Sequence, residues 1–258
     1  KDTVDELHFQ LAKSTAAMVS NSKVEMGEKM ATISGSLLSS RGICKEARFA
    51  DQLTAASCSG FLVAPDLMVT AGHCVRSQSD CSGNSWVFDF SIDAGSNYVP
   101  GTTTMDVDSN NVYRCKEIVE RELSRATSND YALIRLKRDV TDREPLQVRT
   151  EGKVSTGEDL VVIGHPTGLP AKVAAGAWVR DNNNDVYFSS NLDTFGGNSG
   201  SAVFNSETGN VEGILVRGET DYSYDSSRGC RVPNQCENEG CRGEDVTRIT
   251  NIKHLQNN

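Results

Sequence analysis

Apolar residues in this chain come in short runs of four to seven, and this pattern limits the fold more than any other feature. Segments such as CSGFLVA (58 to 64), YALIRL (131 to 136) and LVVIGHP (160 to 166) are separated by Gly, Asn, Asp and Ser. A helix needs an apolar repeat of 3.6 residues, whereas short runs bounded by turn residues are typical of strands. About eleven candidate strands can be counted in this way, which predicts an all-β protein built as a sandwich or a barrel.

The length of 258 residues allows one large or two small domains. A polar stretch, KRDVTDREP (137 to 145), follows an apolar strand and is the best candidate for a linker. We therefore divide the chain into residues 31 to 140 and 141 to 258. Residues 1 to 30 are an extension of unclear role, in which the compact apolar run at 16 to 19 favours a strand over a short helix.

The charge balance argues against a nucleic-acid partner. The formal net charge is -9, and no basic stripe offers the concentrated positive face that phosphate binding needs. No apolar run approaches the roughly 20 residues that span a bilayer, and the chain opens with the polar KDTVDEL rather than with a leader. We expect a processed, soluble monomer without a membrane span.

Eight cysteines, an even number, favour an oxidising compartment, because cytosolic glutathione keeps thiols reduced. Zinc is the alternative for Cys230, Cys236 and Cys241, but this group has no CxxC pair and no nearby histidine. DVDSNNVYRCKE (106 to 117) has acidic spacings like a calcium loop, yet it lacks the required glycine, and VYRCKEIV suits a strand. We predict a secreted protein, extracellular or periplasmic, with no metal and no cofactor.

Three short motifs carry candidate catalytic residues. In FGGNSGSAVF, Gly197 and Gly200 allow a tight turn around Ser199, so that the N–H groups of Gly197 and Ser199 can point to one spot. Such a pair of donors stabilises the oxyanion of acyl transfer. In CSGFLVAPDLMVTAGHC, two apolar strands end at His73, and in NDYALIRL a carboxylate, Asp130, precedes an apolar strand and needs a partner such as an imidazole N–H. The other histidines have no comparable setting and are assigned surface or packing roles: His8, His165 and His254.

Taken in this order, TAGHC, NDYALIRL and GGNSGSAV resemble the three catalytic blocks of the chymotrypsin-like serine peptidases. The resemblance covers roughly residues 31 to 258. It implies two six-stranded antiparallel β-barrels and a short C-terminal helix, with His73 and Asp130 in the first barrel and Ser199 in the second. It also implies that Ser199 is the nucleophile, His73 the general base, and Asp130 the residue that orients His73, with the N–H groups of Gly197 and Ser199 as the oxyanion hole.

One departure from the family pattern concerns activation. Animal trypsins carry an aspartate before the nucleophile, which pairs with a newly cut N-terminus, whereas this chain has Asn198. An asparagine cannot form that ion pair. The GGNSG motif resembles the bacterial branch that includes glutamyl endopeptidases, and it leaves two alternatives: a preformed pocket, or control by a leader cut elsewhere.

The resemblance also points to an acidic substrate pocket. Asp193 stands six residues before Ser199, where trypsin-like members hold an acid for a substrate Lys or Arg. Glu244, in the last strand, is a second acid that is expected to approach the pocket. Together they favour a basic side chain in the substrate.

Other pocket residues conflict with this preference. Arg217 and Gly218 lie in LVRG, the expected rim of the pocket, where Arg217 either neutralises Asp193 or attracts an acidic group. Thr194 matches glutamyl-specific relatives, but Leu215 replaces the histidine that accompanies it there. On balance we predict a preference for Lys or Arg.

For the cysteines, the resemblance implies a disulfide between Cys58 and Cys74, beside His73. Cys81 with Cys115 is a candidate second bridge in the first barrel. The six cysteines other than the first pair allow fifteen pairings, and the group at 230 to 241 is expected to staple a loop of its own.

Two functional hypotheses follow. The first is an endopeptidase that cleaves a protein or peptide substrate through an acyl-enzyme. The second is a catalytically silent homologue that serves as a binding module. An esterase of the α/β-hydrolase type fits less well, because the nucleophile lies in GNSG rather than GxSxG and the order of the three residues differs.

Overall fold

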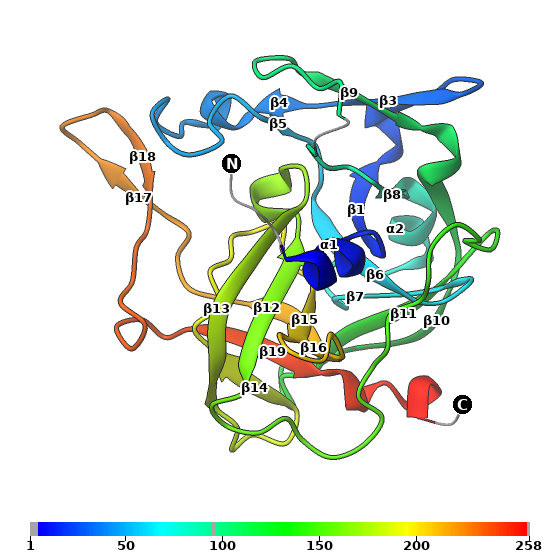
Figure 1. Ribbon diagram of the computed structural model, residues 1–258, viewed down its shortest axis with the longest axis vertical. Helices are drawn as coiled ribbons and strands as arrows, with labels where there is room; N and C mark the ends of the chain where they lie inside the picture. Colours follow the sequence, from blue (N-terminus) through cyan, green and yellow to red (C-terminus); the bar gives the residue numbers. More distant parts are fainter. Residues whose placement is uncertain (1–4, 94–95, 257–258) are drawn as a thin grey trace.

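A computed structural model of the chain describes residues 5 to 93 and 96 to 256, and two closed β-barrels form its body (Figure 1). Each barrel contains six antiparallel strands, which confirms the all-β fold expected from the short apolar runs. The strands of the first barrel, in the order in which they pair, are β1 (Thr15–Ser20), β6 (Cys58–Ala64), β7 (Leu67–Thr70), β11 (Asp130–Leu136), β10 (Val112–Leu123) and β8 (Asn84–Phe88).

The second barrel follows the same plan and is formed by the C-terminal half of the chain. Its strands, again in the order in which they pair, are β12 (Asp159–Gly164), β13 (Lys172–Asp181), β14 (Tyr187–Ser190), β19 (Glu244–Arg248), β16 (Val211–Arg217) and β15 (Ala202–Asn205).

The connection between the barrels contains the polar stretch 137 to 145, which leaves β11 and leads towards β12. The first barrel starts before residue 31, because the apolar run at 16 to 19 is part of β1. Ahead of β1, the helix α1 (Glu6–Ala12) lies against the second barrel, where His8 Nε2 is 3.3 Å from the Ser206 carbonyl oxygen. Part of the expected N-terminal extension is thus integral to the fold, while residues 1 to 4 lie outside the described part of the chain.

Smaller elements surround the barrels. In the part of the chain that the structure describes, three minor sheets are formed by β2 (Val24–Met26), β3 (Met30–Ser34) and β9 (Thr104–Asp108); by β4 (Ser36–Leu37) and β5 (Leu53–Thr54); and by β17 (Tyr222–Asp225) and β18 (Cys230–Pro233). The other helices are α2 (Gln78–Gly83) and the 3-10 turns η1 (Asn21–Lys23), η2 (Leu38–Arg41), η3 (Ser109–Asn111), η4 (Pro166–Gly168), η5 (Ile249–Asn251) and η6 (Lys253–Gln256). The expected C-terminal helix is therefore a 3-10 turn. In the described ranges, no helix is long and apolar enough to cross a membrane.

One hydrophobic cluster crosses the interface between the barrels. It contains Phe61 and Leu133 from the first barrel and Ile163 and Phe204 from the second, all with no exposed area. Burying such a side chain stabilises the fold by about 1.5 to 3 kcal/mol. The shared core therefore holds the facing loops of the two barrels in a fixed relation.

Four disulfides connect the eight cysteines. The bridges Cys58–Cys74 and Cys81–Cys115 are present, which confirms both predicted pairs. Cys236–Cys241 closes a short loop of its own, as expected. The prediction was wrong for Cys230, which pairs with Cys44 at a sequence separation of 186. The reason is that the β17–β18 hairpin folds back onto the loop after η2, where Arg231 pairs with Ile43 as a β-bridge (Figure 1).

Candidate active site

His73 and Asp130 meet in the first barrel, where β7 ends and the neighbouring strand β11 begins. β7 and β11 pair antiparallel, so the turn after β7 and the first residue of β11 lie side by side. A single carboxylate contacts His73 twice: the main-chain N–H donates to Asp130 Oδ1 at 3.0 Å, and the ring nitrogen Nδ1 donates to Oδ2 at 2.8 Å. Since a carboxylate only accepts, Nδ1 carries the proton and Nε2 is left as an acceptor.

Gly72 permits this close approach. A Cβ at this position would lie 2.4 Å from the carbonyl oxygen of Glu122 and 2.8 Å from that of Tyr131. Asp130 is itself only 3% exposed. The glycine in TAGHC therefore lets the main chain of His73 reach a buried carboxylate.

Ser199 lies on a loop of the second barrel that is attached to the first. Its carbonyl oxygen accepts a hydrogen bond from the Ser59 N–H at 2.8 Å and lies 3.7 Å from the sulfur of Cys74, the residue after His73. Within residues 5 to 93 and 96 to 256, no hydrogen bond joins Ser199 Oγ to His73 Nε2. Such contacts are often long before a substrate is bound.

The N–H groups of Gly197 and Ser199 make no hydrogen bond within the described part of the chain. Gly197 and Gly200 both adopt positive φ, 100° and 88°, which favours glycine at both positions. Asn198 between them is buried, and its side-chain oxygen lies 3.4 Å from the Ser201 hydroxyl. Two neighbouring donors beside a nucleophilic hydroxyl are suited to binding a developing oxyanion.

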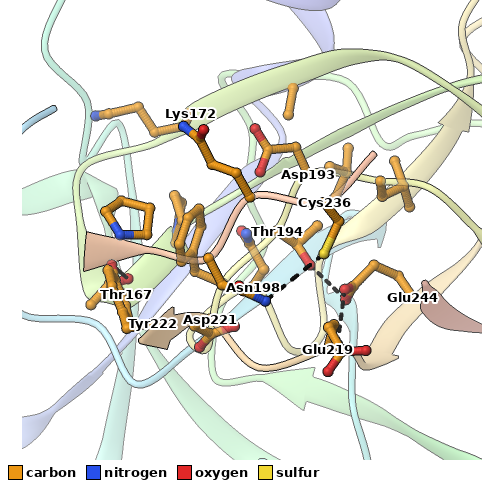
Figure 2. A pocket seen from close by; sticks show the side chains of 18 of the residues that line it. Thr167, Lys172, Asp193, Thr194, Asn198, Glu219, Asp221, Tyr222, Cys236 and Glu244 are labelled. Carbon is orange, nitrogen blue, oxygen red and sulfur yellow. Dashed lines mark hydrogen bonds between the residues drawn. The ribbon is translucent and has the colours of Figure 1, made fainter. Parts of the chain in front are cut away.

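A cavity of about 710 Å³ extends from this loop between the second barrel and the β17–β18 hairpin, and it is lined by Thr194, Asn198, Asp221 and Glu244 among others. Glu244, at the start of β19, is 7% exposed. Its carboxylate accepts from the Thr194 hydroxyl at 2.7 Å and from the Glu219 N–H at 3.1 Å (Figure 2).

Burial raises the pKa of Glu244 to about 7, and the negative charge of Asp221 adds to this effect, against the lowering by its two hydrogen-bond donors. Gly218 packs directly against the carboxylate, because a Cβ there would come within 1.8 Å of Oε2. The structure thus brings Thr194, Gly218 and Glu244 together.

The other predicted pocket residues do not join this group. Asp193 lines the same cavity but is exposed, and Figure 2 shows it directed away from Thr194 and Glu244. Leu215 is 3% exposed and packs in the core of the second barrel.

Arg217 does not neutralise Asp193, which corrects one of the two alternatives. Its Nε donates to Asp245 at 3.1 Å and its Nη2 to the carbonyl oxygen of Ser128 at 3.1 Å. The cause is the register of β16 and β19, in which Arg217 stands opposite Asp245.

Several contact residues were missed from the sequence: Ser59, Thr167, Glu219 and Asp221. All contact the Ser199 loop or Glu244 through hydrogen bonds to or from main-chain atoms, which leave no local signal in the sequence. Potential metal ligands gather at Cys58, His73 and Cys74, whose ligand atoms lie within 4.8 Å of one another. Both sulfurs there belong to one disulfide, so neither offers a thiolate to a metal.

The chain is similar to known peptidases in sequence profile and in fold. The sequence profile of a family described as the trypsin-like peptidase domain matches residues 58 to 214. Among solved structures, the active form of the protease Rv3671c from M. tuberculosis is similar with a TM-score of 0.51 and 14% identity, over 96% of this chain and 82% of that chain. An inactive serine-to-alanine mutant of Rv3671c gives a TM-score of 0.51 and 15% identity, over 96% and 87%. At such identities the likeness shows the fold alone, and no curated protein matches the sequence.

Proposed function

Because this chain belongs to the trypsin-like peptidase family, we propose that it is a serine endopeptidase with Ser199 as nucleophile, His73 as general base and Asp130 as the residue that orients His73. The observation that carries the proposal is the double hydrogen bond between His73 and the buried Asp130 carboxylate, next to the Ser199 loop. The N–H groups of Gly197 and Ser199, which make no hydrogen bond with any described residue, support it as oxyanion donors.

The proposed chemistry proceeds in two steps. His73 Nε2 takes the proton of Ser199 as Oγ attacks the scissile carbonyl carbon, and the resulting oxyanion accepts hydrogen bonds from Gly197 and Ser199. The intermediate expels the amine, which receives the proton from His73, and leaves an acyl-enzyme. Water then attacks the ester by the reverse proton path. Asp130 keeps Nδ1 protonated and stabilises the imidazolium.

Mutants that remove single groups test this proposal. We expect the wild-type chain to hydrolyse an unfolded protein substrate, and Ser199→Ala and His73→Ala to lower kcat by at least about 1,000-fold. Ser82→Ala, an exposed serine on α2, is the matched control and keeps full activity. A folded wild-type chain without any hydrolysis would support the silent binding module instead.

For specificity, we propose that Glu244 rather than Asp193 is the acid that selects Lys or Arg. Glu244 is buried and reaches Thr194 and the Gly218 main chain, whereas Asp193 is exposed and turned away. A charge enclosed by protein interacts with a substrate cation more strongly than a charge in water. Arg217 does not neutralise Asp193, because its guanidinium is paired with Asp245.

We also infer that the protein works in an oxidising compartment, outside the cytosol. All eight cysteines are paired, and one bridge links residues 186 positions apart. Thiol titration of denatured protein from its natural host should find no free thiol. A titre of eight thiols would contradict this inference.

A further inference from the structure

The segment Gly196–Gly197 must keep one orientation if the Gly197 N–H is to face an oxyanion. Neither residue has a Cβ, so local sterics do little to restrict rotation of these peptides. A flipped peptide would present a carbonyl oxygen in place of the donor. The orientation therefore has to be held by contacts from other parts of the chain.

Three successive peptide groups of this segment are each held by one hydrogen bond. The Gly196 N–H donates to Asp221 Oδ2 at 2.7 Å. The Gly196 carbonyl accepts from the Thr167 N–H at 2.5 Å, and the Gly197 carbonyl accepts from Ser59 Oγ at 2.9 Å. The Gly196–Gly197 peptide bond is trans, so its carbonyl oxygen and its N–H point in opposite directions. Because the carbonyl faces Thr167, the Gly197 N–H points away from Thr167.

Ser59 attaches the segment to the first barrel. It lies on β6 with no exposed area, and its hydroxyl also accepts from the His165 N–H at 3.0 Å. Its main-chain N–H donates to the Ser199 carbonyl. Ser59 thus contacts the loop on both sides of the Ser199 hydroxyl, and loss of its Oγ would leave two backbone groups without their partner.

Asp221 attaches the segment to the loop between β16 and β17. Its carboxylate is half-buried. The next residue, Tyr222, contacts the Thr167 hydroxyl at 2.8 Å, and Arg41 Nη1 donates to the Thr167 carbonyl at 2.6 Å. These contacts support Thr167 in a left-handed conformation with φ 53°, which a threonine adopts only under constraint.

Resting on the proposed peptidase function, we propose that Ser59 and Asp221 are positioning residues that hold the Gly197 N–H towards the oxyanion. Both residues hold the segment from within the folded chain, so orientation of the Gly197 N–H does not require an ion pair at Asn198. Asn198 is accordingly buried against the neutral hydroxyl of Ser201.

Steady-state kinetics of Ser59→Ala and Asp221→Ala on a peptide amide test this proposal, together with inhibition by a peptide boronate, which mimics the tetrahedral intermediate. We expect each variant to lower kcat about 10- to 100-fold, somewhat less than removal of an oxyanion donor itself. KM should change by less than about 3-fold, and the boronate Ki should rise by the same factor as kcat falls. If the two residues were merely structural, the rise in the boronate Ki would not match the fall in kcat.

Two variants control for nonspecific effects. Ser85→Ala removes an equally buried hydroxyl, which contacts Asn21 at 2.9 Å on the outer side of the first barrel, and should keep full activity. Asp221→Asn retains an acceptor oxygen for Gly196 and should recover kcat to within about 3-fold of wild type. If Ser59→Ala fails to fold, the Asp221 pair decides alone.

The outcomes separate the two proposals. An inactive wild-type chain would refute the peptidase function. An active wild type with unchanged kcat and boronate Ki in Asp221→Ala, or an equal loss in Asp221→Asn, would refute only the positioning role.

Discussion

The buried carboxylate of Glu244 predicts a substrate preference that depends on pH. Its pKa is raised from 4.5 to about 7, mainly by burial. The carboxyl is therefore mostly neutral at pH 6 and mostly ionised at pH 8, and the ionised fraction rises about 10-fold between them. A preference for a basic side chain should be present above pH 7 and lost as the pH falls below it.

The size of the preference follows from the contact that a substrate cation would make. A hydrogen bond between charged groups contributes about 1.5 to 3 kcal/mol, which corresponds to roughly 10- to 150-fold in kcat/KM. We expect this ratio at pH 8 between a peptide amide with arginine and one with the uncharged isostere citrulline at the cleavage site. At pH 6 the ratio should fall about 5- to 10-fold, the more so the larger it is at pH 8.

The assay is kcat/KM for the two substrates between pH 6 and 8, because this quantity reports ionisation of the free enzyme. Any ionisation that affects both substrates equally cancels in their ratio. Glu244→Gln should bring the ratio near one at every pH. The matched variant Asp193→Asn should change it less than about 2-fold, since Asp193 is exposed to solvent. A wild-type ratio that is constant with pH, or one removed by Asp193→Asn and kept in Glu244→Gln, would refute this reasoning.

Two further predictions concern stability. Because the folded-state pKa of Glu244 lies above 4.5, the folded protein loses stability as the pH rises from about 4.5 to about 7. Chemical denaturation at pH 8 should find Glu244→Gln more stable than wild type by up to about 3 kcal/mol. A gain of the same size at pH 4 would contradict this prediction. Replacing both cysteines of Cys44–Cys230, separated by 186 residues, should lower the free energy of unfolding by about 5 kcal/mol, and replacing Cys236–Cys241 by about 2 kcal/mol; equal losses in urea titrations would show that loop length does not determine the effect.

Local motifs made the barrel fold and the His73–Asp130 contact predictable. Short apolar runs bounded by turn residues indicated strands, and TAGHC placed a glycine where a Cβ would lie 2.4 Å from a carbonyl oxygen. The bridge Cys58–Cys74 joins the two ends of one hairpin, so it too follows from nearby residues.

The pocket could not be predicted in the same way, because it depends on contacts between distant segments. Asp193 and Glu244 are both acids near the expected pocket, and only packing against Gly218 distinguishes the buried one. Cys44–Cys230 depends on how the β17–β18 hairpin folds onto the loop after η2. Ser59 acts through a hydroxyl contact to a main-chain carbonyl 138 residues away, which CSG as a motif does not indicate.

The central claim is that Ser199 is a nucleophile activated by His73, and covalent labelling tests it most directly. The measurement is the rate of reaction of the folded chain with a fluorophosphonate, with the labelled residue located by peptide mass mapping. We predict one label per chain, on Ser199, no label in Ser199→Ala, and labelling slowed by at least about 100-fold in His73→Ala. A folded wild-type chain that takes up no label, or takes it up at another residue, would contradict the account.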